Sequence, residues 1–230
     1  MMSFEIIYKL IGKTGFHLDP NLKAKDKFYI ITRRLFLLLK GLFIGKLFFK
    51  KAEGFIFIGK RFNGVHKWKI SAGKTLSIGS DVTLNALSLN GINFGNNCTL
   101  KDGVTIDCCG ILSSVGDGIY IGDNVGISEQ TLIQVRGRVE IHQDVIIGPG
   151  VKIISENHNF KEQKKIIRIQ GTTRKGIIIE SGSWIGANAV ILDGVKLGKN
   201  TVVAAGAIVN KDTGEGDLVG GIPAKNLSSK

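Results

Sequence analysis

Hydrophobic residues in the last third of the chain recur at every sixth position. The series consists of aliphatic side chains and runs through Ile179, Ile185, Ile191, Leu197, Val203 and Val209. Small or medium-sized side chains follow them by four positions, namely Ser183, Ala189, Val195, Thr201 and Ala207. Six is a multiple of the two-residue period of a strand and not of the 3.6-residue period of a helix, so the pattern predicts short strands with one buried face.

The same frame recurs upstream, interrupted by insertions. Its members are Ile78 and Leu84, then Phe94, Leu100 and Ile106, then Ile121, Ile127, Ile133 and Val139, then Ile141, Ile147 and Ile153. Gly186 and Gly198 directly follow their aliphatic residues, where a tight corner favours glycine. We therefore predict an all-β solenoid, a parallel β-helix with coils of about 18 residues. An antiparallel sandwich is less favoured, because its strands do not hold a six-residue phase.

Three parts of the chain are expected. They are an N-terminal helical segment over residues 1–52, a β-helix domain over residues 53–214, and a tail over residues 215–230. Ile153 and Ile179 lie 26 positions apart, which is no multiple of six. An external loop over residues 156–176 is therefore predicted, and loops of this length are usually functional.

Residues 27–51 depart from the repeat and read as a helix. Lys27, Arg33, Arg34 and Lys40 fall within one arc of a helical wheel, which Ile30 and Leu37 share. We favour a basic amphipathic helix that lies on the anionic inner face of the cell membrane. Two alternatives stay open: a helix that packs on the β-helix, and a membrane-spanning helix, which the central cations oppose.

Composition and charge narrow the function classes. The chain has 230 residues, 31 glycines and 3 prolines, and its 43% hydrophobic content excludes a disordered chain. The net charge of +12 comes from two segments: residues 1–51 hold eleven Lys and Arg against three Asp and Glu, and residues 156–176 hold six against two. Neither segment contains a recognisable nucleic-acid-binding module, so we expect no nucleic acid as partner. Anionic lipid, phosphate-bearing cofactors and acidic glycans fit this charge.

The cysteines and most of the histidines carry no predicted chemistry. Cys98, Cys108 and Cys109 are odd in number and lack zinc-ligand spacing, which indicates a reduced, cytoplasmic protein without a metal. No cleavable signal peptide is evident at Met1. Three histidines are expected to be structural or solvated: His17, His66 and His142, the last of them at a corner of the solenoid.

Four runs resemble the hexapeptide-repeat acyltransferases, and most closely the branch that acetylates sugars in surface polysaccharides and lipopolysaccharides. They are ENHNF at 156–160, IQGTTRKGIIIE at 169–180, WIGANAVILDGVKLGKNTVVAAGAIVNKD at 184–212 and VGGIPAK at 219–225. The resemblance implies a left-handed β-helix, a homotrimer with active sites between subunits, and acetyl-CoA as the donor. The left hand comes from the resemblance alone, because the general rule for parallel crossovers predicts the opposite hand.

The resemblance also implies roles for individual residues. His158 opens the long loop, where the family places its catalytic histidine, and imidazole suits proton removal near neutral pH. The backbone N–H of Ala187 is expected at the thioester. The other residues expected near coenzyme A are Trp184, Gly186, Ala205, Asn210, Lys211, Ile222, Pro223 and Lys225. Two roles stay open for the ring of Trp184: packing beneath the loop, or lining the acceptor cleft.

The acceptor site is less well defined by sequence. The family's acceptor asparagine would fall in ISEQTL at 127–132, where the alignment does not separate Ser128 from Gln130. The other candidates for this cleft are Asn85, Asp107 and Glu156. Glu156 is also a candidate to orient the imidazole, a role that a backbone carbonyl would serve equally well.

Together these features predict an O-acetyltransferase that acts on a sugar of a cell-surface glycan precursor, either nucleotide-linked or lipid-linked. We expect it in the cytoplasm, peripheral to the membrane. N-acetylation of an amino sugar stays open, as does a non-catalytic β-helix that serves assembly or binding. A carbonic anhydrase on this fold needs three histidines on a metal, and the four histidines here lack the close paired spacing of such a site.

Overall fold

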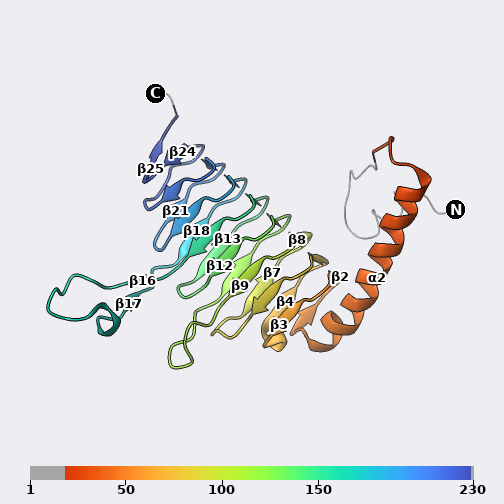
Figure 1. The fold of residues 1–230 in the computed structure, drawn as a ribbon, viewed down its shortest axis with the longest axis horizontal. Coiled ribbons are helices and arrows are strands. Elements are labelled where there is room, and N and C mark those ends of the chain that lie inside the picture. Colours follow the sequence, from red (N-terminus) through yellow and green to blue (C-terminus); the bar gives the residue numbers. More distant parts are fainter. Residues whose placement is uncertain (1–18, 229–230) are drawn as a thin grey trace.

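A computed structural model describes residues 19–228 and shows strands wound into a three-sided solenoid (Figure 1). Sheet A contains β1 (Lys51–Ala52), β4 (Ile70–Ala72), β7 (Ile92–Phe94), β10 (Ile119–Ile121), β13 (Val139–Ile141), β18 (Ile177–Ile179) and β21 (Lys196–Leu197). Sheet B contains β2 (Phe55–Ile58), β5 (Thr75–Ile78), β8 (Cys98–Leu100), β11 (Gly126–Ile127), β14 (Ile146–Ile147), β19 (Trp184–Ile185), β22 (Val202–Val203), β24 (Leu218–Gly221) and β25 (Ala224–Asn226). Sheet C contains β3 (Asn63–Val65), β6 (Thr83–Asn85), β9 (Thr105–Asp107), β12 (Leu132–Gln134), β15 (Lys152–Ile154), β20 (Val190–Leu192) and β23 (Ile208–Val209).

Neighbouring strands in these sheets are parallel, apart from the final pair β24 and β25. Successive strands along the chain enter sheets A, B and C in turn, which confirms the predicted parallel β-helix. Two short 3-10 helices lie outside the sheets, η1 (Lys67–Lys69) and η2 (Ile167–Ile169). The predicted segment 1–52 is described only from residue 19, so His17 lies outside the described residues, as do the last two residues of the predicted tail.

The six-residue series forms the core. Ile191 pairs with Ile153 on one side and Val209 on the other, and all three side chains are buried. Ile179 pairs with Leu197, 18 positions later, as the repeat predicts. The small side chains four positions after the aliphatic residues are buried as well. Burial of these side chains supplies the main stabilisation of the solenoid.

One part of the predicted frame is shifted. Val139 was placed six positions after Ile133, but Ile141 is the residue that pairs with Ile121. Val139 instead pairs with Ile119 and is also buried. The reason is that β13 turns two side chains inward, so the phase moves by two residues without a change of face.

The three corners of the solenoid differ. The corner from sheet A to sheet B and the corner from sheet B to sheet C are short, and residues with positive φ recur there, such as Asn124, Asp144 and Asn188. The corner from sheet C to sheet A, here the C–A corner, carries the insertions. Phe94 pairs with Ile121, 27 positions later, and Ile141 pairs with Ile179, 38 positions later, so these coils exceed 18 residues.

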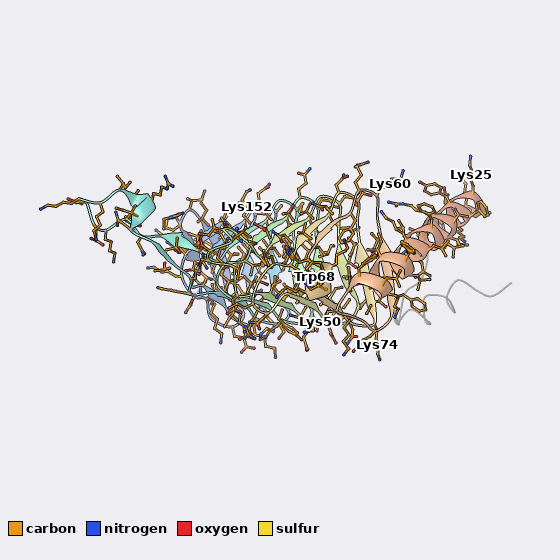
Figure 2. All side chains as sticks on the ribbon, turned by 90° about the horizontal axis from the view of Figure 1, so that it is seen from below. Lys25, Lys50, Lys60, Trp68, Lys74 and Lys152 are labelled. Atoms are coloured by element: carbon orange, nitrogen blue, oxygen red, sulfur yellow. The ribbon has the colours of Figure 1, made fainter. Side chains whose placement is uncertain are left out.

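Helix α2 (Ala24–Phe48) lies against sheet B at the start of the solenoid, at the opposite end of the long axis from the loop over residues 156–176 (Figures 1 and 2). Its buried residues are Gly41 and Gly45, and a methyl group on Gly45 would lie 2.6 Å from Cδ1 of Ile56 in β2. Glycine at these positions lets the helix approach the strand closely. Among residues 19–228, none of the helices has the length and apolarity that crossing a bilayer requires.

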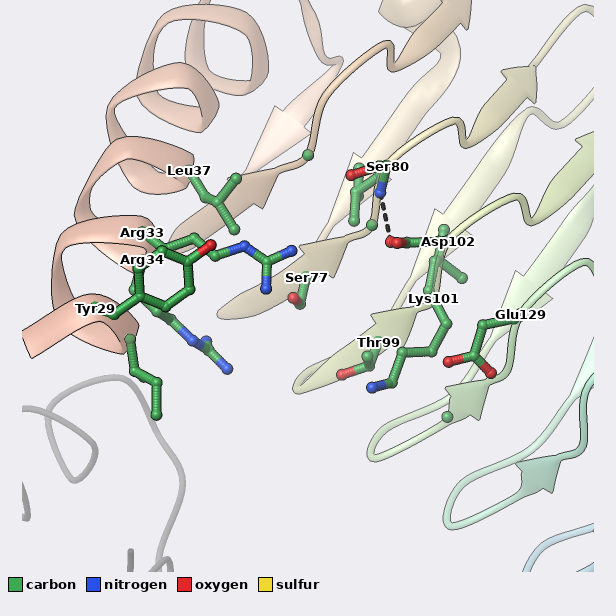
Figure 3. Close-up of a pocket in the computed structure, with 16 residues that line it drawn as sticks. Tyr29, Arg33, Arg34, Leu37, Ser77, Ser80, Thr99, Lys101, Asp102 and Glu129 are labelled. Carbon is green, nitrogen blue, oxygen red and sulfur yellow. Dashed lines mark hydrogen bonds between the residues drawn. The ribbon is translucent and has the colours of Figure 1, made fainter. Parts of the chain in front are cut away.

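A cavity of about 670 Å³ lies between α2 and sheet B (Figure 3). Arg33 and Arg34 line it from the helix, and Lys101, Asp102 and Glu129 line it from the solenoid. The helix therefore turns part of its basic arc toward the solenoid.

Candidate active site

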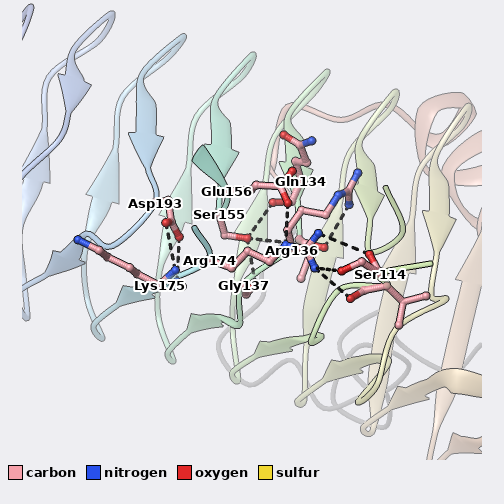
Figure 4. Close-up of polar contacts among 12 residues, drawn as sticks. Ser114, Gln134, Arg136, Gly137, Ser155, Glu156, Arg174, Lys175 and Asp193 are labelled. Atoms are coloured by element: carbon pink, nitrogen blue, oxygen red, sulfur yellow. Dashed lines mark hydrogen bonds and ion pairs between the residues drawn. The ribbon is translucent and has the colours of Figure 1, made fainter. Parts of the chain in front are cut away.

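Two loops leave the solenoid at the C–A corner. The first covers residues 108–118, between β9 and β10, and the second is the predicted loop over residues 156–176, between β15 and β18. The second loop begins and returns through an antiparallel hairpin of β16 (Asn157–His158) and β17 (Thr172–Thr173). Both loops start from the same edge of sheet C, so the residues at their bases are close in space (Figure 4).

A polar chain of three side chains runs along this edge of sheet C. Nδ2 of Asn85 donates to Oδ1 of Asp107 at 2.9 Å, and Nη2 of Arg136 donates to Oδ2 of Asp107 at 2.9 Å. Arg136 is only 5% exposed, and its Nη1 also donates to the backbone carbonyl of Asp107 at 2.8 Å. A buried guanidinium needs such partners, so Asp107 and Arg136 fix each other. Asn85 and Asp107 are therefore neighbours at this edge.

Arg174 connects the two loops. Its Nε lies 2.7 Å from Oε2 of Glu156, where the second loop leaves the solenoid. Its Nη1 donates to Oγ of Ser114 at 3.0 Å, and to the carbonyl of Val115, both in the first loop (Figure 4). The carboxylate of Glu156, which we considered as the group that orients the imidazole of His158, is instead held by this guanidinium.

The ends of the second loop are fixed by further hydrogen bonds. Asp193 accepts from the backbone N–H of Lys175 at 3.0 Å and of Gly176 at 2.9 Å. Oγ of the buried Ser155 accepts from the N–H of Arg136 at 2.9 Å. Within the loop, the side chain of Gln170 bonds the backbone of Glu162 in both directions. The loop is therefore anchored at its base, and hydrogen bonds between its own residues hold its shape.

His158 stands at the start of this loop. In the hairpin it pairs in register with Thr172, and its side chain is exposed. No hydrogen bond or ion pair within the described part of the chain holds its imidazole. A solvent-facing imidazole beside a fixed loop base is a group that can exchange protons with a bound molecule.

His142 has a different setting, at the corner from sheet A to sheet B as expected. Its Nδ1 lies 2.9 Å from Oε2 of Glu180, and its Nε2 lies 3.5 Å from Oε2 of Glu140. Lys196 and, less strongly, His142 hold the pKa of Glu180 below its usual value. His142 is thus part of an ion network on sheet A, away from the C–A corner.

Two of the cysteines are buried as thiols. Burial raises the pKa of Cys98 and of Cys108 to about 12, because the thiolate would lose its hydration. Cys98 fills the interior slot predicted for it, at 1% exposure. Neutral, buried thiols are poor nucleophiles. The described residues also contain no cluster of metal-binding side chains.

The residues expected at the thioester lie at the corner from sheet B to sheet C. Gly186 allows successive coils to stack closely there, because a methyl group on it would lie 2.6 Å from the backbone nitrogen of Ala205. Across residues 19–228, no hydrogen bond is donated by the N–H of Ala187 or of Ala205. Two backbone donors on successive coils therefore remain available to a ligand.

His158 and Ala187 of one chain are not brought together. Ala187 precedes β20 of sheet C, whereas His158 follows β15 of the same sheet, so the two residues stand at opposite edges of sheet C. Ser128 and Gln130 share the edge of Ala187, between β11 and β12, while Asn85 shares the edge of His158. The expected acceptor residues are therefore divided between the two edges.

The remaining residues expected near coenzyme A lie toward the C-terminal end of the solenoid. Asn210 and Lys211 follow β23, Ile222 and Pro223 form the turn between β24 and β25, and Lys225 lies in β25. All five are exposed. Within the described residues, the ammonium groups of Lys211 and Lys225 have no hydrogen-bond or ion-pair partner.

Trp184 lies on the outer face of sheet B, where it pairs with Ile146 and is 53% exposed. Sheet B is the face opposite the C–A corner. The ring therefore does not pack beneath the loop, which was one of its two expected roles.

Sequence reasoning missed the residues that shape the C–A corner: Ser114, Arg136, Arg174 and Asp193. Their partners are distant along the chain, so no spacing reveals them. One signal was present, because the frame breaks between Ile106 and Ile121. This break marks the first loop, which Arg174 joins to the second.

Comparison with known proteins gives partial matches. The family described as bacterial transferase hexapeptide (six repeats) matches residues 176–211. A galactoside O-acetyltransferase of Lactococcus lactis is 31% identical over 130 residues, which cover 56% of this chain and 58% of the relative. A 2,3,4,5-tetrahydropyridine-2,6-dicarboxylate N-acetyltransferase of Staphylococcus aureus is 53% identical over 57 residues, 25% of this chain and 24% of the relative. The chain thus spans little more than half the length of the first of these relatives.

Solved structures agree in fold. An N-acyltransferase from Bacillus cereus, in complex with dTDP-4-amino-4,6-dideoxyglucose and coenzyme A, superposes with a TM-score of 0.53 at 15% identity, over 80% of this chain and 86% of that one. At this identity the likeness concerns the fold. Residues 176–211 thus match the bacterial transferase hexapeptide repeat, and parts of the chain are similar to curated acetyltransferases.

Proposed function

We propose that the chain is an acetyl-CoA-dependent O-acetyltransferase that acts in the cytoplasm on a sugar hydroxyl of a surface glycan precursor. The observation that carries this proposal is the exposed, unpartnered imidazole of His158 at the base of a loop that Arg174 and Asp193 hold in place. The family match of the neighbouring coils supports the reaction class.

His158 is proposed as the general base. A sugar hydroxyl is a weak nucleophile at neutral pH, so removal of its proton during attack lowers the barrier. A neutral imidazole has a ring nitrogen that can accept this proton. Cys98 and Cys108 are buried as neutral thiols and have no role in this proposal, in which the acetyl group passes directly to the acceptor.

The corner from sheet B to sheet C, here the B–C corner, is proposed to bind coenzyme A. When bound, acetyl-CoA supplies an acetyl group activated as a thioester. The N–H of Ala187 would donate to the thioester oxygen as negative charge develops on it. Because close stacking of the coils already fixes this N–H in place, little free energy is spent on orienting it during the reaction. The N–H of Ala205 would donate to the pantetheine chain. Lys225 and, from the opposite edge of sheet C, Lys211 would meet the phosphates, since neither ammonium has a protein partner among the described residues.

The separation of His158 from Ala187 supports a site shared by two chains. We propose a homotrimer in which the C–A edge of one protomer faces the B–C corner of the next. The acceptor would then contact Asn85, Asp107 and Glu156 from one chain and Ser128 or Gln130 from the other. We also propose the left hand for the solenoid, which the match of residues 176–211 to the hexapeptide-repeat family supports.

N-acetylation of an amino sugar is the second candidate function. It is favoured by the N-acetyltransferase relative of Staphylococcus aureus and by the amino sugar in the Bacillus cereus structure. O-acetylation is preferred because the galactoside O-acetyltransferase matches a longer part of the chain.

The test measures coenzyme A release from acetyl-CoA with a panel of nucleotide-linked and lipid-linked sugars, each paired with its amino-sugar counterpart. The proposal predicts release with a hydroxyl acceptor that bears no amine. Release confined to amino sugars would favour N-acetylation. A trimer that binds no coenzyme A would overturn the enzymatic proposal in favour of an assembly or binding protein.

A further inference from the structure

Helix α2 presents two unlike faces. The face toward the solenoid holds Gly41 and Gly45 and also most of the cations that share one arc of the wheel. Nζ of Lys40 donates to the carbonyl of Gly59 at 2.5 Å, and Cζ of Arg34 lies 5.1 Å from the centre of the Phe57 ring. The basic arc, which the sequence suggested as the membrane-binding feature, is thus largely used within the protein.

The opposite face is an apolar stripe that runs almost the whole length of the helix. Its seven side chains are each between 42% and 68% exposed: Phe28, Leu35, Phe36, Leu39, Leu42, Phe43 and Leu47. They recur at three-residue and four-residue steps, so they lie on one side of the helix. Thr32, an uncharged polar residue, lies on the same side of the helix as the stripe. This outward stripe exceeds the scattered apolar residues that a protein surface normally carries.

Exposed cations lie at the two ends of the stripe. Lys25 precedes it, and Lys46, whose Nζ donates to the carbonyl of Ala52, lies near its other end. Asp26 is the only acidic residue of the helix. Figure 2 shows α2 projecting from the end of the molecule, with Lys25 at its far end. The stripe is therefore reachable along its length and lies in a region of positive charge.

We propose that the outward stripe of α2 lies in the boundary between headgroups and acyl chains of an anionic lipid bilayer, with Lys25 at the lipid phosphates. An interfacial helix buries apolar side chains to about this depth and gains from nearby cations. The charge favours lipid over a second copy of the chain, because two such faces would bring like charges together. The stripe, and not the basic arc, is the lipid contact. This inference does not rest on the proposed enzymatic function.

The test is co-sedimentation of the full-length protein with vesicles of phosphatidylglycerol and phosphatidylcholine, and with vesicles of phosphatidylcholine alone, at low salt. The triple variant Phe36→Ser, Leu39→Ser, Phe43→Ser removes the centre of the stripe. Its partition onto the anionic vesicles should fall by about tenfold or more, since each buried apolar side chain contributes to binding. The wild type should bind the phosphatidylcholine vesicles more weakly than the anionic ones.

A matched control removes three apolar side chains of similar exposure from the loop: Phe160→Ser, Ile166→Ser, Ile169→Ser. It should bind anionic vesicles as the wild type does. Thermal melts followed by circular dichroism confirm that both triple variants fold. The proposal is overturned if the stripe variant binds as the wild type does, if the loop variant is the one that loses binding, or if the wild type ignores anionic vesicles. It is also overturned if light scattering shows that the stripe variant dissociates an assembly, since the stripe would then be an interface between copies.

Discussion

The corners of the solenoid divide into two that repeat and one that varies. At the corner from sheet A to sheet B, asparagine side chains form a ladder: Nδ2 of Asn97 donates to Asn124 at 2.9 Å, and Nδ2 of Asn124 donates to Asp144 at 2.8 Å. All three residues have positive φ, which Asn and Asp tolerate better than most residues. At the C–A corner the side chains bonded across coils differ in kind, as in the chain of Asn85, Asp107 and Arg136, and both long loops leave from it.

Close approach of the coils does not set the corners apart, because a methyl group on Gly186 would lie 2.6 Å from the backbone nitrogen of Ala205 and one on Gly137, at the C–A corner, 2.7 Å from that of Gly176. The C–A corner differs in its side-chain bonds across coils, such as those of Arg136 and Arg174, which hold the two insertions in place. The buried core of the repeating coils supplies the stability, and the candidate general base stands where the repeat is interrupted.

The largest expected effect lies in the repeating core. Ile191→Asp should prevent folding or lower the free energy of unfolding by several kcal/mol, because Ile191 is fully buried and its carboxylate replacement would have no partner. Ile191→Val, the matched control, should cost only about 0.5–1.5 kcal/mol. Thermal unfolding followed by circular dichroism measures both. A wild-type melting temperature for Ile191→Asp would contradict the assigned interior.

A smaller effect is expected at the varying corner. Arg174→Met removes the hydrogen bonds that link the two loops. Partly exposed hydrogen bonds of a charged group stabilise the folded loop by about 1–2 kcal/mol. Cleavage of the loop over residues 156–176 by proteinase K should therefore be about 5–30-fold faster, if local opening precedes cleavage. Arg168→Met, in the same loop, is the control and should leave the rate near that of the wild type. Equal rates for all three proteins would show that Arg174 does not hold the loop.

The smallest effect is expected at the coenzyme A contacts. An exposed ion contact contributes about 1 kcal/mol or less, so Lys211→Ala should raise the KM for acetyl-CoA several-fold and leave kcat nearly unchanged. Lys199→Ala, an exposed lysine at another corner, should change neither value. A large loss of kcat at unchanged KM in Lys211→Ala would assign a different role to this residue.

The repeating parts were predictable from sequence, and the varying corner was predictable only in part. A six-residue period is a local property, so it located the buried positions from Ile78 to Val209, apart from the two-residue shift at Val139. The second loop was found because it interrupts that period. The partners of Arg136 and Arg174 were not found, because Asp107 lies 29 positions before Arg136 and Ser114 lies 60 before Arg174.

The orientation of helix α2 was likewise not predictable from sequence periodicity alone. A helical wheel groups the cations of α2 into one arc but does not say which side meets the protein. Gly41 and Gly45 decide the outcome, since only the glycine side can approach Ile56 so closely. This choice turns Arg34 and Lys40 toward the solenoid and leaves the apolar side outward.

The central claim is that the varying corner carries the chemistry, with His158 as the base. It is tested most directly by comparing His158→Ala with His142→Ala, in acetyl transfer to the acceptor that the panel identifies and in the Kd for acetyl-CoA. General-base catalysis contributes about 10²–10⁴-fold, so His158→Ala should lose about that much kcat and keep its affinity for acetyl-CoA. His142→Ala, on the repeating part, should stay within a few-fold of the wild type. Full activity of His158→Ala, or the larger loss in His142→Ala, would contradict the account.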